Sequence, residues 1–326
     1  MQPYFGSGPL WFQQSDLTAD CKDHWWTNII YLNNFIPDGK SSGCLGVGWY
    51  LANDMQFFVI SPVLLWGYHK SRYIGWGLIG ALLCTSILST GLIANHLDTK
   101  VAAFAPNKNQ MEYLYVKPYC RVGAYALGLA TGMILYAYRR FKETGEVYDR
   151  FSVAFCEGLK SLLLRLSITL IGLFLVCFFV FYQYVTYKHP GSDNKYNYWG
   201  DDGNVAFLAF MRVGFILGLA LFMLPVFLGH FGLLASFLGA SFWTPFARIN
   251  FAVYLLHYNI VAAVYRSQQT ELYFDEYYII RDGIYFFIVT VVVAIPVVLL
   301  IEIPCMNLER VLLRRSPPPR NKQTPK

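Results

Sequence analysis

Seven apolar segments follow one another along this chain, separated by polar connections. They lie at about 49–66, 75–95, 120–138, 162–184, 204–229, 247–265 and 283–301. Each is close to the ~20 residues that an α-helix needs to cross a bilayer, and a helix satisfies its own backbone groups inside the hydrocarbon. Three segments contain a proline that should kink the helix, at Pro62, Pro225 and Pro296. The pattern predicts an all-α polytopic membrane protein with about seven transmembrane helices.

The regions on either side of these segments differ from them in composition. Residues 1–48 are polar and aromatic with many glycine and proline breakers, which predicts a loop segment with one short helix around Trp25–Tyr31. Residues 49–304 form the transmembrane domain, and residues 305–326 form a basic tail. The start has no basic stretch followed by an apolar one, so we expect no signal peptide there.

Lys and Arg in the connecting loops predict the orientation of the chain. Lys and Arg are in modest excess on the side of the membrane that holds the loops 67–74 and 139–161 and the C-terminal tail. We therefore predict that the C-terminus is cytosolic and the N-terminus is outside. The membrane would be the plasma membrane or an endomembrane. Cys21 and Cys44 then lie in an oxidising compartment, where they could form a disulfide. An outside segment of this length without a signal peptide leads us to expect further spans upstream of Met1.

Polar residues at membrane depth fall into two groups. An outer cluster near the outer ends of three spans consists of Asn53, Asp54, Gln56, Arg121 and Arg212. An inner cluster at inner span ends consists of Arg165, Arg248 and Glu302, and His257 lies near mid-membrane. A charge at this depth costs a few kcal/mol and usually has a partner or a function.

Two interpretations of these charges stay open. Asp54 could pair with Arg121 or Arg212, and Glu302 with Arg248, as structural ion pairs. The arginines outnumber the carboxylates, however, and surplus arginine favours an anionic guest such as a phosphate group. Arg165 is close enough to a helix end to reach the headgroups instead. His257 is a candidate proton-transfer group, although a lone histidine on a membrane helix is more often a packing element.

Composition supports a membrane protein and excludes several other classes. The 326 residues are 56% hydrophobic and only 14% charged, whereas soluble domains average about 25% charged residues. The formal charge of +6 comes from short loops and the tail rather than from a basic stripe, so we expect membrane lipids as partners and no nucleic acid. There is no Gly-rich phosphate loop and no Cys/His spacing typical of a metal site.

Several stretches resemble motifs of the acyltransferase-3 family, most closely its nose resistant to fluoxetine-like animal branch. Tyr4–Trp11 (YFGSGPLW) and Cys21–Phe35 (CKDHWWTNIIYLNNF) are similar to the loop before the family's WYLA-D-MQ helix, here Trp49–Phe57. Three further stretches show the same likeness: Lys117–Gly132 (KPYCRVGAYALGLATG), Phe237–His257 with its YL-x-H ending, and Glu302–Glu309 (EIPCMNLE).

The resemblance implies a transferase that moves an acyl group, other than an amino-acyl group, from a cytosolic acyl-CoA donor to a lipid or small-molecule acceptor. It implies no bound cofactor and about ten spans, of which this chain would hold the C-terminal portion. The family's first helix, which carries a basic residue and a histidine expected to act in catalysis, has no counterpart before Tyr4. We therefore expect a truncated chain whose catalytic residues are unknown. The outer cluster would shape the acceptor side, and Arg165 and Arg248 would face the CoA phosphates.

Two other functions are weighed against this one. The span count would fit a seven-helix receptor, but the third span ends in Tyr138-Arg139-Arg140 and the seventh contains Ala294-Ile295-Pro296, neither of which matches the motifs of such receptors. A membrane protein that binds or transports lipids or xenobiotics without catalysis would use the same polar cavity. It is the alternative that remains.

Overall fold

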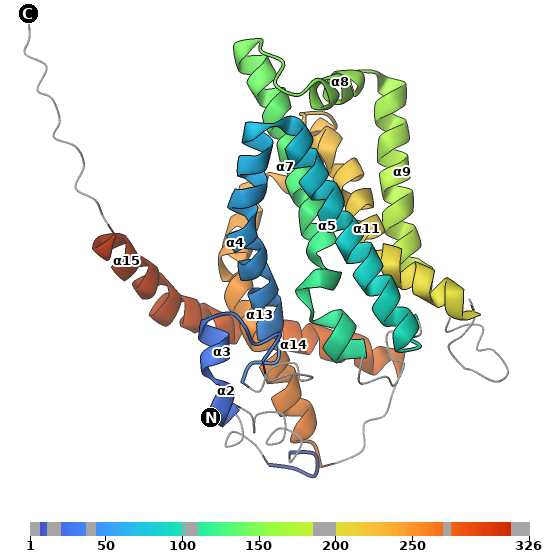
Figure 1. Cartoon of the computed structure of the whole chain (residues 1–326). Helices are drawn as coiled ribbons and strands as arrows, with labels where there is room; N and C mark the ends of the chain where they lie inside the picture. The colour runs from blue at the N-terminus through green and yellow to red at the C-terminus, as the bar shows by residue number, and fades with distance from the viewer. Residues whose placement is uncertain are drawn as a thin grey trace, which may run out of the picture. The chain divides into compact units, whose positions relative to one another are not determined.

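Every regular element in the computed structural model is helical among the residues that it describes, namely 7–11, 21–36, 44–99, 101, 110–184, 200–269 and 275–313. Seven long helices within those residues coincide with the seven apolar segments (Figure 1). They are α4 (Gly48–Lys70), α5 (Arg72–His96), α7 (Val122–Thr144), α9 (Leu162–Phe181), α11 (Gly200–Phe227), α13 (Thr244–Arg266) and α14 (Glu276–Val297). The all-α architecture is as predicted.

Five helical stretches among the described residues are long and apolar enough to cross a membrane. They are α5, α9, α11 and the stretches Gly232–Arg266 and Tyr277–Leu312. The predicted spans on α4 and α7 are not among these five. Helix α4 carries the polar Asn53, Asp54 and Gln56, and α7 ends in a charged stretch. The number of spans therefore stays a prediction.

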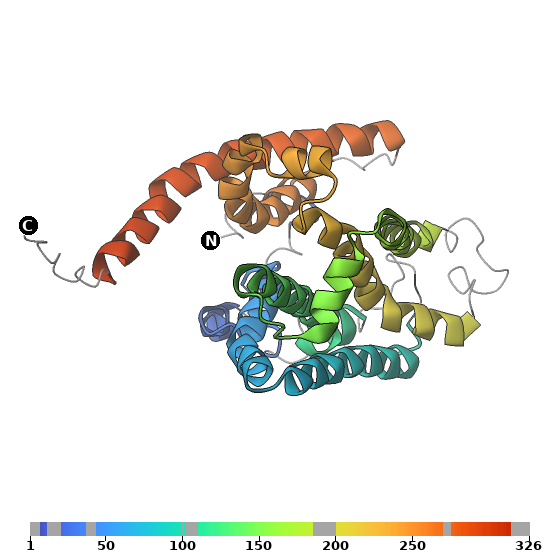
Figure 2. The ribbon, with the colours of Figure 1, turned by 90° about the horizontal axis from the view of Figure 1, so that it is seen from above.

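Residues 17–240 form one compact unit in which the helices pack as a bundle. Helices α4 and α7 both pack on α5, while α11 packs against α5, α7 and α9. The amphipathic helix α8 (Arg150–Gly158) lies across the end where α7 and α9 are joined, which Figure 2 shows from above. Helices α9 and α11 approach closely at Gly172, where an added Cβ would lie 2.7 Å from the Gly218 carbonyl oxygen. Small residues allow such close backbone packing in membranes.

The surface of this unit is apolar where a bilayer would cover it. On α9 only Gly172 is buried, and the large side chains of Leu163, Leu170 and Phe174 are 78%, 64% and 65% exposed. Soluble monomers rarely show a continuous apolar face of this extent. The exposed apolar helices agree with an integral membrane protein.

A disulfide cross-links the polar segment before α4. It contains α2 (Cys21–His24) and α3 (Trp26–Ile29), the latter within the short helix predicted around Trp25–Tyr31. Cys21 and Cys44 are joined, with their Cα atoms 4.6 Å apart.

The second unit comprises residues 1–16 and 241–326. Helices α13 and α14 pack through Ala252 and Ala294, and Val298, the residue after α14, joins the same apolar cluster. Helix α14 continues after Pro296 into the π-helical turn η5 (Val298–Glu302) and then α15 (Ile303–Leu312), one long rod in Figure 2. The π-helical turn follows a proline that removes one backbone donor. The predicted domain boundary at residue 304 falls inside α15, and residues 314–326 of the tail lie outside the described residues.

Candidate functional site

The amide side chains of α4 hold the preceding loop in place. Asn34 Nδ2 donates to Asn53 Oδ1 at 2.7 Å and to Gln56 Oε1 at 3.2 Å. Gln56 Nε2 donates to the Tyr31 carbonyl oxygen at 2.8 Å and to Asn34 Oδ1 at 2.9 Å. Asn53 Nδ2 donates to the carbonyl oxygen of Val116 at 3.0 Å, and the Asn53 side chain is buried. These amides therefore serve structure first, because the loop satisfies their hydrogen-bonding groups.

Two cations of the Lys117–Arg121 stretch are fixed beside this network. Lys117 is only 5% exposed, and its Nζ donates to the Asn34 carbonyl oxygen at 2.9 Å. The Arg121 guanidinium lies 4.5 Å from the ring centroid of Trp49 and 4.4 Å from that of Tyr115, and its Nε donates to the Tyr115 carbonyl oxygen. Aromatic faces attract a guanidinium without neutralising it. Arg121 thus keeps its full positive charge.

Asp54 and Arg121 line one pocket of about 180 Å³ but do not form the ion pair weighed above. The pocket lies between α4 and α7 and is lined by Tyr50, Asn53, Asp54, Phe57, Arg121, Ala124 and Tyr125. Asp54 is exposed, and no ion pair in the described residues involves Asp54, Arg121 or Arg212. Arg212 Nη1 donates instead to the carbonyl oxygen of Cys120 at 3.4 Å. Within the part of the chain that the structure describes, both arginines of the outer cluster are without a carboxylate partner.

A larger pocket of about 380 Å³ lies at the other end of the same helix pair. It is lined by Leu65, Tyr68, His69, Gly128, Leu129, Gly132, Met133, Tyr136 and Tyr148. None of these residues was among the site residues predicted from the sequence. Most of its lining is aliphatic or aromatic, so it suits an apolar ligand.

A buried carboxylate organises the wall of this apolar pocket. Asp149 Oδ2 accepts hydrogen bonds from Trp76 Nε1 at 2.9 Å, Ser152 Oγ at 2.8 Å and Tyr68 Oη at 3.3 Å. Burial alone would raise the pKa of Asp149, but the bonds from Trp76, Ser152 and the Phe151 backbone N–H outweigh it and leave that pKa below its usual value. A carboxylate that accepts several hydrogen bonds stays ionised. Asp149 thereby fixes Tyr68, a pocket residue.

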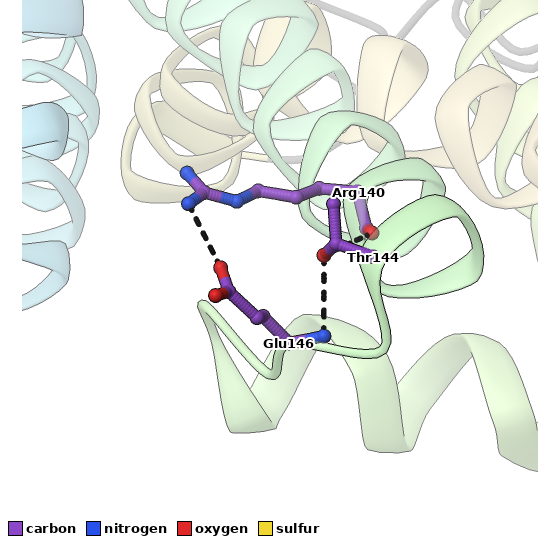
Figure 3. A network of polar contacts seen from close by, with 3 residues as sticks. All are labelled: Arg140, Thr144 and Glu146. Atoms are coloured by element: carbon purple, nitrogen blue, oxygen red, sulfur yellow. Dashed lines mark hydrogen bonds and ion pairs between the residues drawn. The ribbon is translucent and has the colours of Figure 1, made fainter.

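Cationic side chains surround the neighbouring Tyr148. Its hydroxyl donates to the Tyr68 carbonyl oxygen at 2.7 Å, while Arg72 Nη1 donates to the Tyr148 carbonyl oxygen at 3.2 Å. Arg140 lies 5.2 Å from the Tyr148 ring centroid. Figure 3 shows Arg140 paired with Glu146 at 3.1 Å, next to the bond from the Glu146 N–H to Thr144 Oγ1 at 3.2 Å. The edge of the pocket at Tyr148 thus carries the cations Arg72 and Arg140 as well as the acidic Glu146, whereas the pocket lining itself is mostly apolar.

Comparison with known proteins settles the family. The sequence model of a family described as "Acyltransferase domain" matches residues 4–303. The chain belongs to the acyltransferase-3 family. It is also similar to "Nose resistant to fluoxetine protein 6" of Caenorhabditis elegans, with 26% identity over 285 residues, which cover 82% of this chain. The chain spans about a third of the length of that relative, since the match covers 31% of it. No solved structure matches.

The remaining predicted site residues of this acyltransferase-3 chain are not brought into one cluster. Arg165 on α9 lies with Nη1 3.0 Å from His230 Nδ1, in the unit formed by residues 17–240. Arg248 and Glu302 belong to the other unit and form no ion pair within its described residues. His257 Nδ1 lies 2.6 Å from the Tyr254 carbonyl oxygen of its own helix, and the side chain is exposed.

Proposed function

We propose that this protein is a membrane acyltransferase that moves an acyl group from acyl-CoA to a lipid or other small-molecule acceptor. Support comes from the family and from one feature of the bundle. Helices α4 and α7 carry a polar pocket with an unpaired arginine at one end and an apolar pocket with a basic rim at the other. An acyl transfer needs room for an apolar chain and for polar, anionic groups.

The described residues would bind and orient the reactants. In the transfer, the thioester C–S bond of the donor breaks, a bond forms between the acyl carbon and the acceptor oxygen or nitrogen, and the acceptor's proton ends on the CoA thiol. Arg121 and Arg212 have no carboxylate partner among the described residues, so each can take an anionic group of the acceptor, such as a lipid phosphate. Correct orientation of two reactants supplies much of the rate of such a reaction.

Arg212→Ala tests this role in the full chain reconstituted in liposomes with radiolabelled palmitoyl-CoA. Removing a charge-assisted bond of about 1.5–3 kcal/mol should lower kcat/KM for the acceptor by about ten- to a hundredfold. Arg139→Ala is the matched control, because Arg139 is exposed and forms no ion pair with any residue that the structure describes. Equal turnover by both variants would exclude Arg212 from substrate binding, and no turnover by the wild type would mean that this chain by itself is not an active acyltransferase.

Lipid or xenobiotic binding without catalysis is favoured by one separate observation. A pocket of about 420 Å³ among α9, α11 and α12 (Gly232–Leu238) is lined by Thr169, Phe222, Phe231, Gly232, Leu233 and Leu234, without a titratable side chain. Uptake of a labelled lipid into vesicles without acyl turnover would support this function instead.

A further inference from the structure

The apolar pocket between α4 and α7 exists because two positions on α7 are glycines. Gly128 and Gly132 lie one helical turn apart and both line the pocket. A Cβ added at either position would meet no atom within 4 Å. The open space above them is therefore room that a larger side chain would occupy. The volume of about 380 Å³ is at the lower end of the ~300–1,000 Å³ of small-molecule sites.

The walls of the pocket are held in a fixed arrangement. Tyr68 is 4% exposed and hydrogen-bonds to Asp149, and the Tyr148 hydroxyl donates to the carbonyl oxygens of Tyr68 and His69 at 2.7 and 3.2 Å. These bonds join parts of the chain about 80 residues apart. A pocket whose aromatic walls are already ordered loses little conformational entropy when a ligand enters.

Positive charge at the rim indicates what the ligand carries at its polar end. Arg72 donates to the Tyr148 carbonyl oxygen. Neither Arg72 nor the exposed Lys70, which follows pocket residue His69, forms an ion pair among the described residues. Arg140 lies against the Tyr148 ring and has one acidic partner, Glu146. The arrangement fits an acyl chain attached to an anionic phosphate group.

We propose that this pocket holds the acyl chain of the acyl-CoA donor, and that Gly128 and Gly132 set the longest chain that it accepts. The identity of the donor rests on the function proposed above. The acyl chain lies along α7 over the two glycines, and the basic residues Lys70 and Arg72 face the CoA portion of the donor. A larger side chain at either glycine would displace methylene groups of the acyl chain from the pocket, and each displaced methylene would lose its apolar contacts.

Photolabelling tests the pocket without relying on turnover. The full chain in lipid nanodiscs is exposed to diazirine-bearing palmitoyl-CoA or octanoyl-CoA, and labelled peptides are identified by mass spectrometry. Gly132→Leu and Gly128→Leu should each weaken binding of the palmitoyl probe about tenfold, the cost of displacing about two methylenes, and leave the octanoyl probe unchanged. Gly77→Leu is the matched control, since Gly77 on α5 also has open space beyond its Cα but does not line this pocket. Leucine favours a helix over glycine, so the variants should fold.

Three results would overturn the inference. One is equal palmitoyl labelling of the two α7 variants and the Gly77→Leu control. Another is labelling confined to peptides that contain none of the residues lining the pocket. A third is competition for the pocket by a phospholipid but not by palmitoyl-CoA, which would assign the site to a membrane lipid. Wild-type labelling within α4 or α7 that is weakened by Gly132→Leu, together with absent acyl transfer, would keep the acyl-chain pocket and reject the acyltransferase function.

Discussion

Neighbouring residues on α4 have opposite roles at the scale of single side chains. Asn53 is buried and hydrogen-bonds through both atoms of its amide, to Asn34 and Val116, whereas Asp54 is exposed and has no ion-pair partner in the described chain. Asn53→Ala should lower the free energy of unfolding by about 1–3 kcal/mol, because it leaves buried partners unsatisfied. Asp54→Ala should change it by less than about 0.5 kcal/mol. Thermal unfolding of the two variants in detergent measures this difference in stability. Equal losses of stability in Asn53→Ala and Asp54→Ala would contradict the prediction.

The pKa of Asp149 gives a second prediction at this scale. Its folded-state pKa lies below the ordinary value. The ionised Asp149 therefore stabilises the fold at pH values above its unfolded-state pKa, and this stabilisation is lost as pH falls through the folded-state pKa. Asp149→Asn should therefore lower Tm at neutral pH. On acidification below about pH 4, the Tm of this variant should fall by less than the Tm of the wild type. Thermal unfolding over a pH series checks this, with exposed Glu143→Gln as the control. A parallel drop in wild type and Asp149→Asn would rule out the carboxylate as the cause.

At the scale of elements, long apolar runs were sufficient to predict the helices but not their contacts. The seven segments match seven long helices because each run satisfies the length and polarity that a membrane helix requires. Helix α8 falls within 139–161, which the sequence analysis read as a connecting loop, because its nine residues are too short and too polar to read as a span. The apolar pocket was missed because Tyr68 and Tyr148, 80 positions apart in the sequence, come into contact only in the folded chain. Sequence spacing on one helix does not predict such contacts.

A third prediction concerns the stability of the segment before α4. It is tied by the Cys21–Cys44 disulfide and by the amides of α4 through Asn34. Replacing both cysteines by serine should lower stability by about 2–4 kcal/mol and speed proteolysis of this segment, because the open chain gains conformational freedom. Limited proteolysis followed by mass spectrometry measures the rate at residues 21–44. Cleavage at the wild-type rate would mean that the Asn34 network alone holds the loop.

For the whole molecule, the predicted orientation and the proposed donor site depend on each other. The basic rim at Lys70 and Arg72 lies in a loop that the excess of Lys and Arg assigns to the cytosol, where acyl-CoA is found. A membrane-impermeant maleimide should therefore reach Cys21 and Cys44 in intact cells after mild reduction. The same reagent should reach Glu143→Cys, at the exposed end of α7, only after permeabilisation. The five remaining cysteines are replaced by serine in both measurements. The reverse labelling pattern would place the basic rim outside the cytosol, and acyl-CoA could then no longer be the ligand of the α4–α7 pocket.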